Sequence, residues 1–229
     1  MPGHILLAGG AEFGGRMAEP DMRAIELAGG EAARISIIPT AAAPDHNHER
    51  AGRSGVRWFE SLGARNVVAL PLIDRASADS PAVVAALRES RLIYLLGGFP
   101  HYLGQALLGS ASWLAILAAQ QAGAVVAGSS AGAMVLCQHY FDPTSSQVIE
   151  GLGMLPNTCV LPHHNTFGKG WATRLAALLP ESVLLGIDER TAMLDGGDGG
   201  AWRVYGQGAV TLYRHGQPAV YKPGAEFDL

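Results

Sequence analysis

The sequence predicts an α/β protein with a mainly parallel sheet and a short antiparallel extension at its C-terminal end. Short apolar runs recur from the N-terminus to Ile187, and each ends in a glycine or a turn before a helical pattern follows. Their nearly continuous hydrophobicity is typical of strands whose sheet is covered by helices on both faces. After Leu194 the pattern changes to glycine-rich turns and short alternating segments, which favour antiparallel pairing.

Each expected element has a recognisable pattern. The strands of the parallel sheet are expected at residues 5–8, 35–38, 67–72, 92–96, 124–127 and 183–187, and the antiparallel strands at 201–205 and 209–213. Ser80 with Pro81, and Ser110, are typical of helix starts, and Gly123 is expected to end the second helix. No repeat, low-complexity tract or linker is apparent, so residues 1–229 are expected to form a single domain.

Composition excludes several classes of partner. The 229 residues are 48% hydrophobic and carry a net charge of −4, from 16 basic and 20 acidic residues, without any run of like charges. This balance argues against a nucleic-acid face or a membrane-surface patch. A secretory signal pattern and a membrane-length apolar stretch are both absent, so a cytoplasmic protein is expected. There, Cys137 and Cys159 are expected to be core residues and not a disulfide.

The strongest chemical signal lies at residues 124–136, where an apolar strand runs through Gly-Ser-Ser-Ala-Gly into a helical segment. This pattern indicates a nucleophile elbow with Ser130 at its tip, because Gly128 and Gly132 let strand and helix approach closely. The same turn points the N–H of Ala131 to the place where an oxyanion would form. Ser129 lies one residue before the centre of the turn and is the weaker candidate. A close-packed crossover turn without chemistry is the competing interpretation.

A second glycine turn follows the preceding strand. Gly97 and Gly98 end the run at residues 92–96 and are expected at the same edge of the sheet as Ser130, since parallel strands end together. The N–H of Gly98 could then be a second oxyanion donor. A simple turn that ends a strand accounts for the two glycines about as well.

A serine nucleophile needs a base within hydrogen-bond reach and a group that orients that base. His163 and His164 follow an apolar stretch and are the candidate bases. Asp188 and Glu189 follow the run at residues 183–187 and are the nearest candidate carboxylates, with Asp195 and Asp198 further along.

Taken together, these pieces resemble the serine peptidase family that contains aspartyl dipeptidase and cyanophycinase. The matching segments are Ile38-Pro39-Thr40-Ala41-Ala42, Gly97-Gly98, Gly128-Ser129-Ser130-Ala131-Gly132-Ala133 and Gly186-Ile187-Asp188-Glu189-Arg190-Thr191-Ala192. The resemblance implies a three-layer α/β/α sandwich with a flavodoxin-like sheet, of the class I glutamine amidotransferase type. It also implies a Ser-His-Glu triad of Ser130, His163 and Glu189, with His164 as the alternative base.

The resemblance further implies the activity. A small peptide or amide would be cleaved through an acyl-enzyme on Ser130, with Gly98 and Ala131 binding the oxyanion and with no metal or organic cofactor. The resemblance also implies that Phe99 and Pro100 contact the substrate, because they stand where cyanophycinase-like chains carry an acidic residue and glutamine. Since these polar groups are replaced, the substrate itself does not carry over. A homodimer is possible, and neither nucleic acid nor membrane is an expected partner.

Other interpretations stay open at the level of sequence. A glutamine amidotransferase is disfavoured because the elbow bears serine and the chain has no His-x-Glu pair. An α/β-hydrolase-type esterase would pair Ser130 with His215 and with Asp195 or Asp198. A binding module without turnover is a third possibility. A metal hydrolase would use Asp45, His46 and His48.

Overall fold

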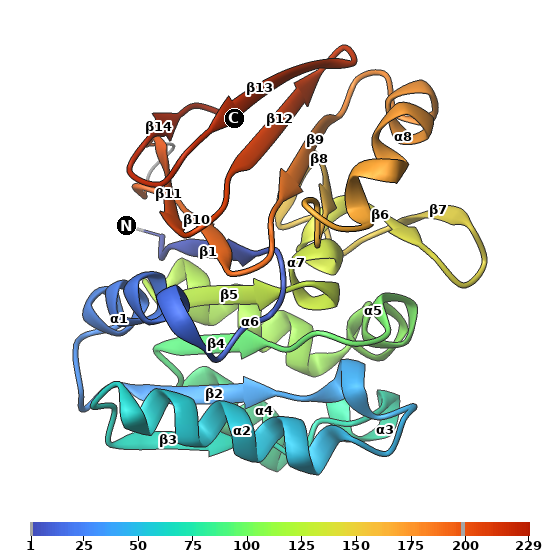
Figure 1. The fold of residues 1–229 in the computed structure, drawn as a ribbon. Coiled ribbons are helices and arrows are strands. Elements are labelled where there is room, and N and C mark those ends of the chain that lie inside the picture. Colours follow the sequence, from blue (N-terminus) through green and yellow to red (C-terminus); the bar gives the residue numbers. More distant parts are fainter. Residues whose placement is uncertain (1, 198–199) are drawn as a thin grey trace.

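The computed structural model describes residues 2–197 and 200–229, which form two β-sheets surrounded by helices (Figure 1). The larger sheet has eight strands in the order β14-β11-β10-β1-β5-β4-β2-β3. Its bounds are β1 Ile5–Ala8, β2 Arg34–Ile38, β3 Asn66–Ala69, β4 Leu92–Leu95, β5 Val125–Ser129, β10 Thr191–Leu194, β11 Trp202–Gly206 and β14 Glu226–Phe227. Strands β1 to β5 pair in parallel, whereas β10, β11 and β14 pair antiparallel beyond β1, so this sheet is mixed.

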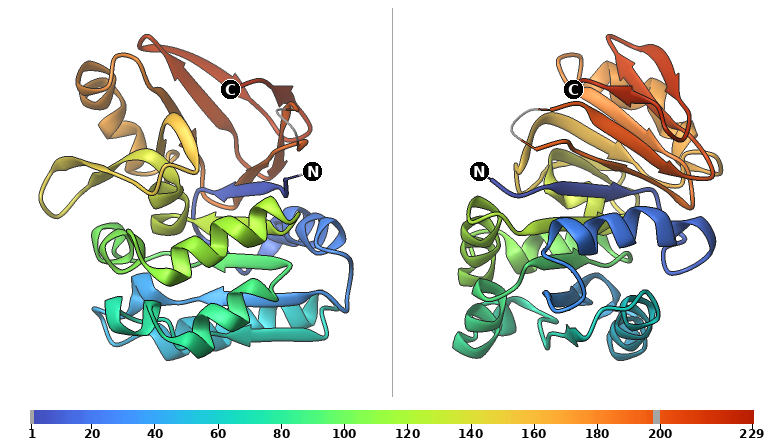
Figure 2. Two further views of the ribbon diagram at one scale, coloured as in Figure 1. Left: turned by 180° about the vertical axis from the view of Figure 1, so that it is seen from behind. Right: turned by 90° about the vertical axis from the view of Figure 1, so that its left-hand side faces the viewer.

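Helices cover both faces of the parallel strands, as the edge-on view in Figure 2 shows. Helices α1 (Ala18–Leu27) and α2 (His48–Ser61) pack on one face, and α4 (Pro81–Arg88) and α6 (Ala111–Gln121) pack on the other. Successive side chains of β1 follow this division, because Leu6 joins the core under α1 and α2 while Leu7 joins the core under α4 and α6. The expected burial of the strands on both faces is therefore confirmed.

A second, six-stranded sheet holds much of the chain after residue 136, in the order β13-β12-β9-β8-β6-β7. Its bounds are β6 Cys137–Asp142, β7 Gln147–Glu150, β8 Leu155–Leu161, β9 Val183–Ile187, β12 Val210–Arg214 and β13 Gln217–Tyr221. Strands β6, β8 and β9 run parallel, and the other three pair antiparallel with them or with one another. In Figure 1 this sheet lies above the parallel strands of the larger one, with α7 between them.

The expectation of a single sheet was wrong, although the larger sheet does have an antiparallel extension, formed by β10, β11 and β14. The strands β11 and β12 form close to their expected positions, yet they belong to different sheets, and β9 lies in the second sheet and not beside β5. Strands β6 and β8 were missed because polar residues interrupt their apolar runs, namely Gln138 and His139 in β6 and Pro156 and Asn157 in β8. A pairing partner far away in the chain leaves no local pattern in the sequence.

The remaining helices are short and lie at loops and strand ends. Their bounds are the 3-10 helices Gly15–Met17, Thr40–Ala42 and Gly168–Trp171 and the α-helices α3 Arg75–Ala78, α5 Pro100–Leu107, α7 Ala131–Leu136 and α8 Ala172–Leu178. Ser110 caps α6 by accepting from the N–H of Trp113 at 3.0 Å, whereas the hydroxyl of Ser80 makes no such bond at the start of α4.

Two further expectations bear on the described residues. Cys137 and Cys159 are free and buried, as expected, and burial raises the pKa of the Cys137 thiol to about 12. No single helix in the described ranges has the length and apolar character needed to cross a membrane. The pair α5 and α6 meets that criterion only jointly, with a bend of 87°.

Candidate active site

Ser130 lies at the turn between β5 and α7 in a rarely populated backbone conformation, with φ 48° and ψ −111°. Its N–H donates to the carbonyl of Ala8 at 2.9 Å, which fixes the turn against the end of β1. The helix comes so close to β4 that a Cβ on Gly132 would lie 2.2 Å from the carbonyl oxygen of Leu95. Strain of this kind costs energy and persists where the surroundings over-determine it, as at a nucleophile elbow.

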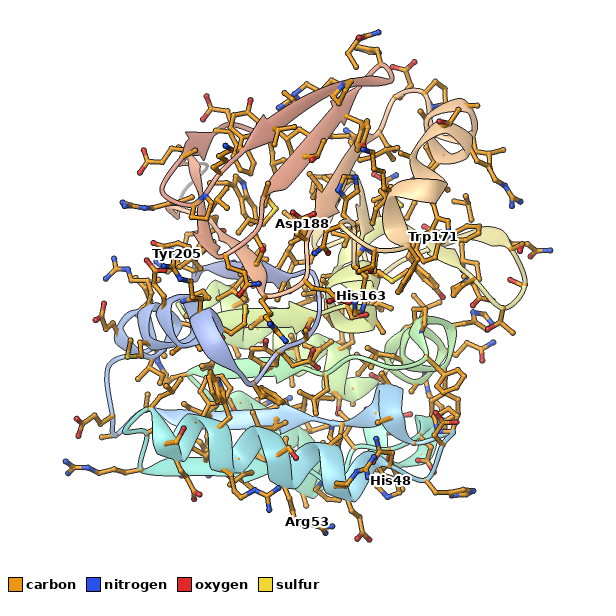
Figure 3. All side chains as sticks on the ribbon, in the orientation of Figure 1. His48, Arg53, His163, Trp171, Asp188 and Tyr205 are labelled. Atoms are coloured by element: carbon orange, nitrogen blue, oxygen red, sulfur yellow. The ribbon has the colours of Figure 1, made fainter. Side chains whose placement is uncertain are left out.

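His163 connects Ser130 to Glu189. Its Nε2 lies 3.1 Å from Oγ of Ser130, and its Nδ1 lies 2.8 Å from Oε1 of Glu189. His163 follows β8 and Glu189 follows β9, so each group lies just beyond the carboxyl end of a strand. Figure 3 shows His163 near the middle of the molecule, where the two sheets meet. With its proton on Nδ1, the imidazole donates to the carboxylate and can accept from the serine hydroxyl.

The loop after β1 holds the histidine and carboxylate loops together. The N–H of His163 donates to the carbonyl of Gly9 at 2.7 Å, and the N–H of Arg190 donates to the carbonyl of Gly10 at 2.9 Å. Gly10 has φ 115°, and a Cβ there would lie 2.3 Å from Cε1 of His163. Only glycine fits this position, because both the backbone conformation and the imidazole exclude a side chain.

His164 points away from Ser130. It is buried, with Nε2 2.9 Å from the hydroxyl of Tyr213 and Nδ1 3.4 Å from Oδ1 of Asp188. Burial lowers the pKa of His164, although the neighbouring Asp188 opposes this effect. The structure thus brings His163, and not its alternative His164, to the serine.

Two N–H groups beside Ser130 are free to bind an oxyanion. Within the described chain, neither the N–H of Gly98 nor that of Ala131 donates to a protein acceptor. Gly98 follows β4, and Ala131 is the first residue of α7, so both lie beyond the carboxyl ends of neighbouring strands. The N–H of Phe99 is not available, because it donates to the carbonyl of Ala41 at 2.8 Å.

A cavity of about 240 Å³ opens beside the Gly97–Gly98 loop. Phe99 lines it, whereas Pro100 is buried as the first residue of α5 and is not among the described residues that line it. Glu12 also lines the cavity, and its Oε2 accepts from the hydroxyl of Ser129 at 2.8 Å.

Three neighbours of the site were not found from the sequence. Glu12 follows β1 in the same way that Ser130 follows β5, and this shared sheet edge is the signal that could have revealed it. Asn165 accepts from the N–H of Glu189 at 2.9 Å. Phe167 stacks on the imidazole of His163 with ring centroids 4.9 Å apart. The last two had no signal beyond their nearness to His163 in the chain.

The other candidate residues do not meet at Ser130. His215 is exposed at the turn between β12 and β13, at the top of Figure 1, and Asp195 lies 3.0 Å from His4. Asp198 lies outside the described residues. In the part of the chain that the structure describes, no three His, Cys, Asp or Glu side chains converge as metal ligands, so Asp45, His46 and His48 form no such cluster. His48 lies on α2 at the lower edge of Figure 3.

Comparison with known proteins identifies the family. The model of peptidase family S51 matches residues 5–200. The chain belongs to peptidase family S51. A cyanophycinase from Nostoc sp. is 32% identical over 222 residues, which cover 91% of this chain and 72% of that protein.

Solved structures agree with this assignment. The crystal structure of a peptidase from an acI-B1 Actinobacterium has a TM-score of 0.89 and 32% identity, and the match covers 100% of this chain and 98% of the other. A putative peptidase E protein from Listeria monocytogenes shares the fold, with a TM-score of 0.62 at 17% identity over 97% of this chain and 99% of the other. This member of family S51 is a hydrolase, a serine peptidase with a mixed α/β fold.

Proposed function

We propose that this S51 peptidase cleaves a small peptide or amide through an acyl-enzyme on Ser130, with His163 as general base and Glu189 as the group that orients it. The observation that carries the proposal is the continuous relay from Oγ of Ser130 through both ring nitrogens of His163 to Glu189, with contacts of 3.1 and 2.8 Å. Contacts of this length are within reach for proton transfer.

In the first step His163 takes the hydroxyl proton of Ser130 on Nε2 while Oγ attacks the carbonyl carbon. The carbonyl oxygen becomes an oxyanion, and the free N–H groups of Gly98 and Ala131 would donate to it. Glu189 keeps the proton of the ring on Nδ1 and stabilises the imidazolium that forms. The strained turn holds Ser130 half-buried with Oγ already in contact with Nε2 of His163, so the serine need not rearrange before it attacks.

In the second step the tetrahedral intermediate collapses. The imidazolium gives its Nε2 proton to the leaving nitrogen, the C–N bond breaks, and the acyl group stays on Ser130. Water then enters beside His163, loses a proton to Nε2, and attacks the ester carbonyl. When this second tetrahedral intermediate collapses, the bond between the carbonyl carbon and Oγ breaks and Oγ takes the proton from Nε2, which releases the acid and restores Ser130. Phe167 covers one face of the imidazole and limits its motion during both steps.

A small fluorophosphonate tests the proposal, because such probes form a stable phosphoryl ester only with an activated serine. Intact wild-type protein is expected to gain a single adduct that Ser130→Ala abolishes. Ser129→Ala is the matched control, since it removes the neighbouring hydroxyl and is expected to keep the adduct. An adduct that survives Ser130→Ala, or a folded wild-type protein that never reacts, would overturn the assignment.

A further inference from the structure

The cavity beside Ser130 has the size of one amino-acid residue and lies on one side of the nucleophile. Its volume is about 240 Å³, below the range that holds drug-sized ligands. The cavity is lined by Gly97 and Gly98 of the turn after β4 and by Glu12 and Phe13 of the loop after β1. His163 is not among the described residues that line it, so the imidazole and the cavity occupy different places around Ser130.

This division separates the two halves of a substrate. The group that His163 protonates is the leaving nitrogen, which must therefore lie on the side of the imidazole. The acyl residue then extends the other way, past the Gly97–Gly98 turn and into the cavity. The chemistry of the cavity walls consequently decides which acyl residue is accepted.

Those walls carry negative charge and no positive charge. The described residues that line the cavity are Glu12, Phe13, Ala42, Asp45, Asn47, Ala51, Ser54, Leu96, Gly97, Gly98 and Phe99. Two exposed cations of α2 bond to lining residues: Arg50 donates to Asn47 at 2.8 Å and Arg57 donates to Ser54 at 3.3 Å. Neither arginine is among the described residues that line the cavity.

Glu12 is the charged group next to the nucleophile. Its Oε2 is fixed by the hydroxyl of Ser129, while Oε1 has no hydrogen-bond partner among the described residues. A Cβ built on Gly97 would lie 3.5 Å from this Oε1 and 3.3 Å from Cβ of Ser130. The free carboxylate oxygen and the nucleophile therefore flank the same glycine, with open space in front of it.

We infer that the cavity binds a cationic nitrogen of the acyl residue, with Glu12 as its direct partner, and that it disfavours an acidic acyl residue. The inference rests on the proposed function, since it needs Ser130 as the attacking group. An ammonium or guanidinium group would satisfy the free Oε1 with a charge-assisted hydrogen bond. A carboxylate in the same position would meet Glu12 without a countercharge and would be repelled. The cation comes either from the α-amino group or from a basic side chain.

Diphenyl α-aminoalkylphosphonates test this inference, because they carry one acyl-residue mimic and react with an activated serine by losing phenol. The set consists of lysyl, alanyl and aspartyl probes, each prepared once with a free α-amine and once with an acetylated α-amine. The measurement is the second-order rate of Ser130 labelling by intact mass spectrometry, for wild type, Glu12→Gln and Glu49→Gln. Glu49 is an exposed carboxylate on α2 that does not line the cavity, so Glu49→Gln makes the same charge change elsewhere.

The lysyl probe with a free amine is expected to label wild type at least about tenfold faster than the aspartyl probe, and Glu12→Gln is expected to remove most of this preference. Glu49→Gln is expected to behave as wild type. If acetylation of the lysyl probe leaves its rate unchanged, the side chain supplies the cation. If acetylation slows the lysyl and alanyl probes alike, the α-amino group supplies it.

Two results would overturn the inference. One is equal labelling of wild type by the lysyl and aspartyl probes together with rates that do not change when the α-amine is acetylated. The other is a Glu12→Gln variant that slows the free and the acetylated forms of every probe by the same factor. A fluorophosphonate control separates these failures from failure of the proposed function. A protein that reacts with the fluorophosphonate but shows no preference for cationic probes keeps its nucleophile and loses only the inference about Glu12.

Discussion

A buried carboxyl group on α1 makes stability depend on pH in a direction that can be measured. Asp21 is fully buried, with Oδ2 accepting from the indole N–H of Trp58 at 2.7 Å and Oδ1 unpartnered among the described residues. Burial raises the pKa of Asp21 from 3.8 to about 7; the Trp58 hydrogen bond opposes this rise, and the charge of Glu12 adds to it. Asp21→Asn keeps the size and an acceptor for Trp58, and removes the titration.

The sign and size of the effect follow from proton linkage. The folded state binds the Asp21 proton more tightly than the unfolded state does, so this group stabilises the fold fully below pH 3.8 and loses that contribution as pH rises through about 7. Each tenfold change in proton affinity is worth about 1.4 kcal/mol, which gives about 4 kcal/mol for the whole change. Between pH 5 and pH 8 the contribution of Asp21 to the free energy of unfolding is expected to fall by roughly 2–3 kcal/mol.

Urea unfolding of wild type and Asp21→Asn at several pH values between 5 and 8 measures this difference. The substitution itself changes the free energy of unfolding by an amount that is independent of pH. The readout is therefore how the difference in free energy of unfolding between the two proteins changes with pH. As pH rises from 5 to 8, the free energy of unfolding of the variant is expected to increase relative to that of wild type by roughly 2–3 kcal/mol. Glu19→Gln is the control, because Glu19 is exposed on the same helix. If the free energies of unfolding of wild type and Asp21→Asn change in parallel with pH, the reasoning is refuted.

Three further predictions concern the relay itself. Gly10→Ala is expected to lower kcat/KM by about 10²-fold or more by displacing the imidazole of His163, whereas Gly14→Ala, which meets no atom within 4 Å, is expected to be neutral; similar values for both would contradict this. Glu189→Gln is expected to cost roughly 10²–10⁴-fold in kcat, since an amide favours the wrong tautomer, and unchanged kcat would exclude Glu189 as the orienting group. Phe167→Ala is expected to slow turnover by up to about tenfold through loss of stacking on the imidazole, with circular dichroism unchanged; full activity would mean that the stacking has no role.

The parallel strands could be predicted from the sequence because their burial is a local property. Runs such as residues 5–8 and 92–96 are apolar throughout, since helices cover them on both sides, and the structure confirms them as β1 and β4. The second sheet could not be predicted in this way. Its strands β6 and β8 contain polar residues, and the choice of β9 to pair with β8 and β12 depends on contacts between distant parts of the chain.

The site was predictable to the extent that its residues lie at strand ends. Ser130 and the Gly97–Gly98 turn could be inferred because small residues directly after an apolar strand are typical of a tight turn into a helix. The histidine was ambiguous between His163 and His164, and only the packing of Tyr213 and Asp188 on His164 separates the two. Glu12 was missed because a single acidic residue in a loop is usually solvated, and only its place after β1, at the sheet edge that also bears Ser130, could have revealed it.

The carbonyls of Gly9 and Gly10, in the loop after β1, make the proposed active site depend on segments from distant parts of the chain. Gly9 and Gly10 bond to His163 and Arg190, which are among the most distant partners in sequence that the fold brings together. Contacts of such long separation form late, because the chain must first close a large loop. With His163 as the proposed base, we expect a fragment that lacks the segment after β9 to leave the histidine without its orienting partner and therefore to be inactive. We expect the same of the growing chain, whose peptidase activity would begin only after this segment has folded.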